Sequence, residues 1–215
     1  MHTYDRNYFK IALPAALEGL FMILLASTDL VMVGALGALS IAAVSIFMQP
    51  RLILLCFSRS LASSVTLLVS QKAGAGDTNG TSDIMKKSLT LCAIFMGLLH
   101  ILFYIFLDDI FYLMGANDEY MAEAMAYGPI ALAAVYVTSL TLILQAVQLG
   151  YGRTSVIMKT NVCGNVVNLA LNALLIFGFG PIPSLGVTGA AIGTLVSTIF
   201  TLTWTAWILK NESFF

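Results

Sequence analysis

The stretch from Ile11 to Gly37 constrains the fold more than any other part of the sequence. It is apolar over more than the roughly 20 residues that a helix needs to cross a bilayer, yet it contains Pro14, Glu18 and Asp29. A carboxylate near the centre of a membrane helix costs roughly 2.5 to 3.5 kcal/mol on insertion scales, so we expect Asp29 to face protein or water. The step from Glu18 to Asp29 returns to within about 20° of the same helix face.

An acidic side chain inside a membrane helix usually belongs to an ion or proton site, and this is how we interpret Asp29. The alternative is a neutral, hydrogen-bonded aspartate that only fixes helix packing. Glu18 is a candidate for lining the same interior space. Pro14 removes a backbone hydrogen bond inside the helix and is therefore expected to let the helix bend.

The composition indicates a multi-pass membrane protein. The 215 residues are 59% hydrophobic and 10% charged, with a mean hydropathy of +0.92, which does not fit a soluble domain. The chain has room for about six spans with short connections and for no separate soluble domain. Its three cysteines lie singly in apolar runs, so we expect no metal site beyond a possible Na⁺. No GxxxxGKS/T loop occurs, so we expect no use of ATP. We also expect no cofactor and no nucleic-acid partner.

Hydropathy predicts an all-α, polytopic bundle of six transmembrane helices, forming one unit over residues 1–215. Most Lys and Arg residues lie before the first helix, in the second and fourth connections, or after the last helix, whereas the third connection is acidic. The positive-inside rule then places both termini in the cytoplasm, with the protein in the cell membrane. The expected helices are about 9–34, 41–70, 87–108, 120–146, 155–178 and 187–209.

Polar residues also interrupt the predicted helix at 41–70. Arg51 and Arg59 are separated by about 80° around a helix, so both are expected to line the interior, together with Gln49. The two arginines either pair with an acid of the first helix, extend toward the membrane surface, or contact an anionic substrate. Pro50, beside them, is a second expected bend.

The predicted helix at 155–178 carries a stripe of asparagines. Hydrogen bonds between helices explain one or two such residues in a membrane bundle. A full stripe favours a wet cavity, because amide oxygens coordinate a hard cation such as Na⁺ and amide nitrogens orient a carboxylate. Gln145, on the preceding helix, is a further candidate for lining this cavity. The asparagines follow steps of four, three and four, and are Asn161, Asn165, Asn168 and Asn172.

Five motifs occur in order along nearly the whole chain, and together they resemble one known family. They are P-x3-E at Pro14, Asp29 with the following VMVGALG, QKAGAGD at 71–77, Asn168-x3-Asn172 followed by LLIFG, and LGVTGAAIGT at 185–194. This set resembles the N-terminal lobe of multidrug and toxic compound extrusion (MATE) transporters. The resemblance implies an antiporter in which a Na⁺ or H⁺ gradient drives export of cationic or amphipathic compounds through a cavity between two six-helix lobes.

The resemblance also implies a coupling-ion site and a partner. The family's coupling carboxylate falls on Asp29, and its polar partners fall on Tyr127, Asn168, Asn172 and Thr194. Some relatives have an aspartate where this chain has Asn172, so this lobe has one acid fewer and does not match a site for Na⁺ with two carboxylates. The expected partners are the lipid bilayer, a small-molecule substrate and a second six-helix lobe, either a C-terminal half or a second copy.

The same sequence features are also compatible with functions other than antiport. A flippase for lipid-linked oligosaccharides, from the wider superfamily, is favoured if Arg51 and Arg59 meet a phosphate. The chain can also be a non-transporting helper or a truncated half. An enzyme is not expected, because His100, the only histidine in the predicted spans, has neither an HExxH motif nor a nucleophilic partner.

Overall fold

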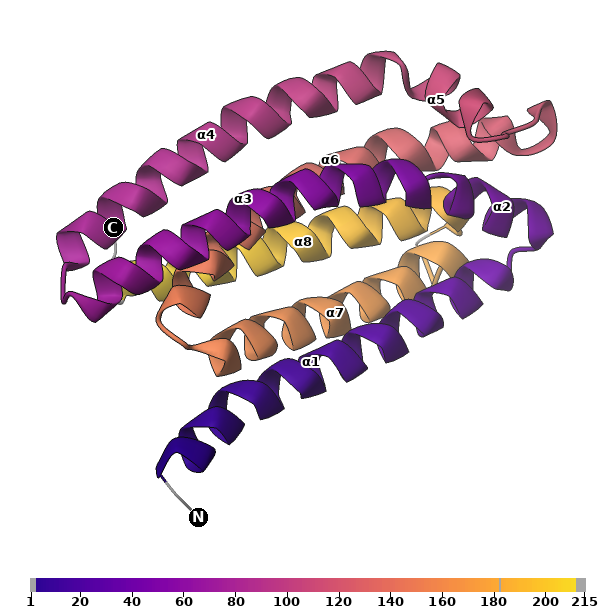
Figure 1. The fold of residues 1–215 in the computed structure, drawn as a ribbon. Coiled ribbons are helices and arrows are strands. Elements are labelled where there is room, and N and C mark those ends of the chain that lie inside the picture. The colour runs from indigo at the N-terminus through magenta and orange to yellow at the C-terminus, as the bar shows by residue number, and fades with distance from the viewer. Residues whose placement is uncertain (1–2, 182, 212–215) are drawn as a thin grey trace.

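The computed structural model of the chain describes residues 3–181 and 183–211. Within its first helix, the side chains of residues 3–11, 14, 15, 18, 22, 25 and 26 lie outside this description. The described chain is an all-α bundle of long helices (Figure 1). The helices are α1 (Thr3–Gly34), α2 (Ala38–Ile46), α3 (Met48–Gly74), α4 (Thr78–Ile105), α5 (Leu107–Leu113), α6 (Asp118–Gly150), α7 (Thr154–Phe177) and α8 (Gly186–Asn211).

Five helical segments in the described part of the chain are long and apolar enough to cross a membrane. They are Ala38–Gly74, which contains α2 and α3, and then Thr78–Ile105, Asp118–Gly150, Thr154–Phe177 and Gly186–Asn211. The prediction of a multi-pass helical protein is therefore confirmed. The sixth predicted span, at 9–34, corresponds to α1, and the count of six stays a prediction because part of α1 lies outside the described residues.

The central helix of the bundle is α6. It packs against α2, α3, α4 and α8, while α7 packs against α1 and α8. Its buried positions include Ile143 and Val147, both with no exposed surface. Hydroxyl groups add hydrogen bonds from α3: Ser58 Oγ donates to Ser139 Oγ at 2.7 Å, and Thr66 Oγ1 donates to the Ala146 carbonyl at 3.3 Å. Such short polar side chains commonly join helices in membrane proteins.

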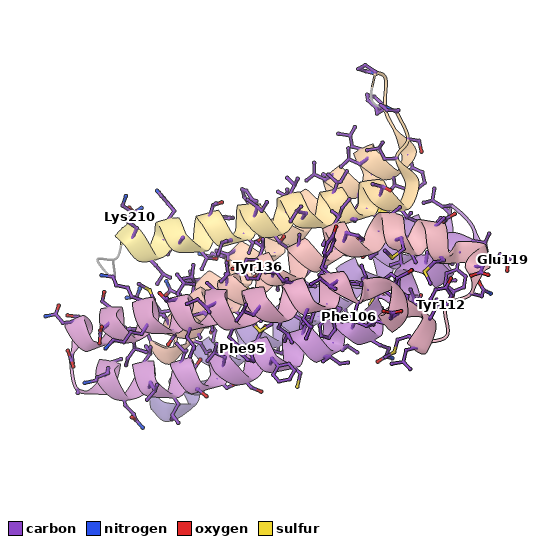
Figure 2. All side chains as sticks on the ribbon, turned by 90° about the horizontal axis from the view of Figure 1, so that it is seen from above. Phe95, Phe106, Tyr112, Glu119, Tyr136 and Lys210 are labelled. Carbon is purple, nitrogen blue, oxygen red and sulfur yellow. The ribbon has the colours of Figure 1, made fainter. Side chains whose placement is uncertain are left out.

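The two ends of the bundle differ in charge. Figure 2 shows Glu119, near the start of α6, at one end, and Lys210, at the end of α8, at the other. The α3–α4 and α6–α7 connections lie at the same end as the C-terminal end of α8 (Figure 1). Lys72 and Arg153 lie next to these connections, and Lys87 lies about two and a half turns into α4. The basic residues next to the connections therefore gather at one end, as the sequence predicts.

The predicted helix at 41–70 begins earlier, at Ala38, and is interrupted at Phe47. Pro50 lies in the first turn of α3, where its missing N–H costs no helical hydrogen bond. A proline ring crowds the carbonyl of the residue four positions earlier, which here is Ile46, the last residue of α2. The interruption therefore lies about one turn before the proline.

The predicted start of the third helix, at residue 87, is wrong, because α4 begins at Thr78. Its first turns are polar, so hydropathy does not include them in a span. Asp77 caps this end: its Oδ1 accepts the Gly80 N–H at 2.8 Å, and Lys72 Nζ lies 2.9 Å from its Oδ2. The Lys72 ammonium, followed by the Gly80 N–H, holds the pKa of the Asp77 carboxyl below its usual value.

The helices α7 and α8 touch closely at Gly189. A Cβ atom on Gly189 would lie 2.5 Å from the carbonyl oxygen of Leu175 and 3.0 Å from the backbone nitrogen of Ile176. Backbone atoms cannot rotate away as a side chain can. Any side chain at position 189 therefore pushes α8 away from α7.

We expect Gly189→Ala to lower the thermal midpoint of the protein in detergent, because overpacking of a tight contact costs about 1–3 kcal/mol. Gly97→Ala is the matched control, since a Cβ there would meet only the Tyr136 side chain at an ordinary 3.8 Å. Unfolding followed by tryptophan fluorescence measures the difference. Equal midpoints for the two variants would contradict the expected contact between α7 and α8.

Candidate functional site

A polar cavity lies between the wall formed by α1, α7 and α8 and the wall formed by α3 and α6. Its volume is about 390 Å³. Asn161 and Asn172 both line it, and their separation along α7 corresponds to roughly 16 Å of helix. Asp29 is the only acidic side chain among the described lining residues. The cavity is thus elongated and combines one carboxylate with many neutral polar groups.

Asp29 is tied to α7 by an amide. Nδ2 of Asn172 donates to Oδ1 of Asp29 at 3.1 Å, and Asn172 itself is only 2% exposed. The amide oxygen of Asn172 lies against Gly193 of α8, where any Cβ would occupy the space of that oxygen. This oxygen is buried and has no hydrogen-bond partner in the described part of the structure. Gly193 therefore makes room for the amide that holds Asp29.

The amide of Asn168 bridges Asp29 and Thr194. With its nitrogen toward α1, Asn168 donates to Asp29 Oδ2 at 3.1 Å and accepts the Thr194 N–H at 3.2 Å. With its oxygen toward α1, Asn168 instead donates to Thr194 Oγ1 at 3.3 Å. In that orientation the Asn168 oxygen also accepts from Asn172 Nδ2 at 3.3 Å.

All four asparagines of the predicted stripe line the cavity. Asn161 and Asn165 are half-buried, whereas Asn168 and Asn172 are 7% and 2% exposed. Gln145 also lines the cavity, and its Nε2 donates to Asn161 Oδ1 at 2.7 Å. The stripe therefore runs from an accessible region beside α6 to a buried region beside Asp29.

The opposite wall carries Arg51, Arg59 and Tyr127, which all line the cavity. Both arginines are exposed in this lobe. The ring of Tyr127 packs edge-to-face against Phe47, with the ring centroids 5.8 Å apart. Phe47 is the residue at which α2 ends and α3 is about to begin, so this contact fixes Tyr127 next to the interruption.

The prediction that Gln49 lines the interior is wrong. The cavity face of α3 is formed by Met48, Arg51, Leu55 and Arg59, which follow one another at steps of three or four residues. Gln49 is about 200° around the helix from Arg51 and is exposed outside the cavity. The sequence shows the spacing of these residues but not which helix face turns inward.

The sequence predicts that three further residues bend a helix or line the cavity, namely Pro50, Pro14 and Glu18. Pro50 is buried at the start of α3. The side chains of Pro14 and Glu18 lie outside the described residues, so their roles in bending and in lining the cavity stay predictions.

Sequence reasoning missed a set of hydroxyl groups on α6 and α8. The signal is present, because Thr138, Thr141 and Gln145 on α6 follow steps of three and four residues. A similar spacing occurs on α8 after Thr194. Hydroxyl groups are common throughout membrane helices, so this pattern is less distinctive than four asparagines. The missed residues that line the cavity are Thr138, Thr141, Ser197, Thr198 and Thr201.

The polar groups around Asp29 suit a monovalent cation or a proton. One carboxylate lies among amide and hydroxyl oxygens, a ligand set that hard cations prefer. Among the described residues, no group of three or more His, Cys, Asp or Glu side chains lies together in a geometry for a metal ion. A cation beside Asp29 would therefore depend on neutral oxygens for most of its contacts.

Comparison with known proteins identifies the family. A family model described as MatE matches residues 14–174, which is more than half of the chain. This chain belongs to the MATE family of transporters. The family membership confirms the resemblance that the five sequence motifs indicate.

Two relatives illustrate the similarity to MATE proteins. A probable multidrug resistance protein NorM from Rhizobium meliloti is 28% identical over 193 residues, which cover 90% of this chain and 41% of the relative. An FAD transporter from Shewanella oneidensis is 27% identical over 210 residues, which cover 95% of this chain and 45% of the relative. The chain thus spans less than half the length of these two relatives.

Solved MATE structures share the fold. An outward-facing multidrug resistance MATE transporter of the MOP superfamily superposes with a TM-score of 0.87 at 25% identity, covering 97% of this chain and 46% of that one. A MOP superfamily transporter from Pyrococcus furiosus gives a TM-score of 0.86 at 25% identity, covering 94% and 44%. The described bundle therefore corresponds to one lobe of a MATE transporter.

The exposure of the asparagine stripe predicts a gradient of chemical access. In a background without native cysteines, we expect Asn165→Cys to react with a charged methanethiosulfonate at least about tenfold faster than Asn172→Cys, because thiol modification follows exposure. Val166→Cys is the control at the same depth, since Val166 is 55% exposed but lies outside the cavity, on a face that a bilayer would cover. Mass spectrometry of the labelled protein in nanodiscs gives the rates, and equal rates at 165 and 166 would contradict a water-filled cavity.

Proposed function

We propose that this chain forms one lobe of a secondary antiporter that exports drugs or cationic or amphipathic metabolites, driven by a Na⁺ or H⁺ gradient. The observation that carries this proposal is the position of Asp29. Its carboxylate lines a polar cavity inside an apolar bundle and is held by an amide of α7. Ionisable groups inside membrane segments are costly, and they typically mark ion or proton pathways. Relatives named multidrug resistance proteins support an export role.

In this proposal the driving ion changes the hydrogen bonds that hold α1 against α7 and α8. A proton on Asp29 turns the carboxyl group into a donor, so the Asn168 oxygen faces it and the Asn168 nitrogen turns to Thr194 Oγ1, 3.3 Å away. Na⁺ would instead keep Asp29 ionised and draw amide oxygens toward itself. Either ion changes the hydrogen bonds between α1, α7 and α8. Because α1 packs mainly on α7, its position is sensitive to these bonds.

Removing the charge of Asp29 tests this coupling. We expect Asp29→Asn to abolish gradient-driven efflux from vesicles while the protein keeps its fold, because the amide can neither take up a proton nor neutralise Na⁺. Asp83→Asn is the matched control, since Asp83 is an exposed acid that pairs with Lys87 at 2.7 Å outside the cavity. Normal coupled efflux by the Asp29 variant would refute the assignment. Imposing Na⁺ and H⁺ gradients separately identifies the driving ion.

The proposed location is the cell membrane, with six spans and both termini in the cytoplasm. Five spans come from the described helices, and α1 supplies the sixth in this proposal. The gathering of Lys and Arg residues next to the connections at one end of the bundle supports the orientation, because basic connections stay in the cytoplasm. The acidic start of α6 then faces outward.

We further propose that a second six-helix lobe, either a C-terminal half or another copy, closes the cavity. The described residues form a wall on each side of the cavity, and Arg51 and Arg59 on one of these walls are exposed. Charged groups facing lipid would each cost a few kcal/mol, so this surface needs a partner. Transport by alternating access also needs two parts that move against each other.

Expression of residues 1–215 alone tests the need for a partner. We expect no dye export by a monomeric lobe, and we expect activity when a second lobe is co-expressed or when the chain dimerises. Native mass spectrometry in nanodiscs measures the oligomeric state, and vesicle assays measure export. A stable monomer that moves a dye against its gradient would overturn the two-lobe proposal.

Two alternatives make different predictions in the same assays. A non-transporting half would bind a partner without supporting export in any combination. A flippase for lipid-linked oligosaccharides would move a phosphate-bearing lipid, and the two arginines of the cavity favour this candidate. The relative named an FAD transporter adds a further substrate type within the family. Membership of the family is therefore compatible with more than one class of substrate.

A further inference from the structure

Arg51 and Arg59 lie in the central part of a membrane span. The span Ala38–Gly74 consists of α2 and α3, which meet at Phe47. Arg51 lies about 20 Å from the first residue of this span, measured along the two helices, and Arg59 lies about 22 Å of helix from the last. Both positions are thus far from either end of the helical segment. An arginine at such a depth is costly in lipid, and it is normally kept where it meets a partner or lines a polar pathway.

Both arginines face the cavity without a close acidic partner. Each is exposed and lines the cavity, and among the described residues neither has a carboxylate oxygen within 4.0 Å. The alternatives to ligand binding are pairing with Asp29 or Glu18 and extension to the membrane surface, and the side chain of Glu18 lies outside the described residues. Asp29 is instead bonded to Asn172, and the cavity already gives the two guanidinium groups a polar environment. As far as the described residues extend, the guanidinium donors are therefore available to a ligand.

The charged lining is positive overall. The described lining has two basic residues, Arg51 and Arg59, and one acid, Asp29, so this part of the lining carries one net positive charge when Asp29 is ionised and two when it is neutralised. A cation in this cavity would meet two like charges, whereas an anion would meet two planar donor groups that suit phosphate and carboxylate oxygens. The arginines are about 12 Å apart along α3.

We propose that the cavity binds an elongated amphipathic organic anion, whose phosphate or carboxylate groups contact Arg51 and Arg59. This inference rests on the proposed transport function and narrows its substrate class. Asn161 and Asn165 supply further donors and acceptors on the facing wall, and Gln145 supplies them on the wall of the arginines. Apolar lining at Leu55 and Leu142 suits the non-polar part of such a molecule.

The sign of the charges also sets how substrate and driving ion affect each other. Neutralisation of Asp29 removes the one described negative charge of the lining, so it strengthens the binding of an anion. A cationic substrate would be bound less tightly after the same neutralisation, because the charges that remain are those of the two arginines. An Asp29→Asn variant should therefore bind the anion at least as tightly as the unchanged protein.

Two xanthene dyes with similar ring systems test the substrate charge: fluorescein, an anion, and tetramethylrhodamine methyl ester, a cation. Binding is measured by fluorescence polarisation with the chain and its completing second lobe in nanodiscs. We expect fluorescein to bind more tightly than the rhodamine. Arg51→Gln and Arg59→Gln should each weaken fluorescein binding about tenfold or more, as expected for loss of a charge-assisted hydrogen bond.

Matched variants separate charge from folding. Lys86→Gln removes a positive charge at an exposed site outside the cavity and should leave both dissociation constants unchanged. Arg51→Lys and Arg59→Lys keep the charge and should restore part of the affinity for fluorescein. Asp29→Asn should keep or tighten fluorescein binding. Thermal unfolding of each variant confirms that the protein is folded.

The outcomes distinguish this inference from the proposed transport function. Failure of fluorescein to bind, equal affinity in folded Arg51→Gln and Arg59→Gln variants, or weaker fluorescein binding in Asp29→Asn would each overturn the anion site. Arginine-dependent binding of fluorescein would support the site even if vesicle assays found no gradient-driven export. Coupled export of the rhodamine with no binding of fluorescein would keep the transport function and reject the anion.

Discussion

The hydrogen bond from Asn172 to Asp29 is the interaction on which the site depends. A carboxylate within an apolar helix needs a partner, and α7 supplies one at 3.1 Å. The same amide fits only because Gly193 of α8 leaves space for its oxygen. Three helices are therefore positioned around one acidic group. A change at Asp29 reaches Asn168 and Thr194 through direct contacts, without any longer path through the protein.

The helix α6 is both the core of the bundle and part of the cavity wall. One side of it packs against α3 and α4, with Ile143 and Val147 fully buried. Another side presents Thr138, Thr141 and Gln145 to the cavity. A rigid packed helix thus holds one wall of the cavity, whereas α1, which packs mainly on α7, holds Asp29. The binding surface combines a firmly packed wall with a more lightly packed one.

The sequence predicts those parts of the fold that depend on local periodicity or on hydropathy. The asparagine stripe follows helical spacing, so its common face could be inferred without knowing any neighbour. Gln49 shows the limit, because the phase of α3 is set by packing against α6 and not by the sequence of α3 alone. The start of α4 depends on the Asp77 cap, which hydropathy does not detect. The role of Gly193 appears only when Asn172 lies opposite it.

The central position of α6 has a consequence for synthesis of the chain. Its hydrogen bonds to earlier helices join residues far apart in sequence: Ser40 to Glu123, Ser58 to Ser139 and Thr66 to Ala146 are separated by 83, 81 and 80 residues. The ribosome completes α2, α3 and α4 before α6 exists. The hydroxyl groups on α2 and α3 therefore lack their hydrogen-bond partners, in the membrane or its insertion machinery, until α6 has been synthesised. The growing chain is most exposed to misassembly during that interval.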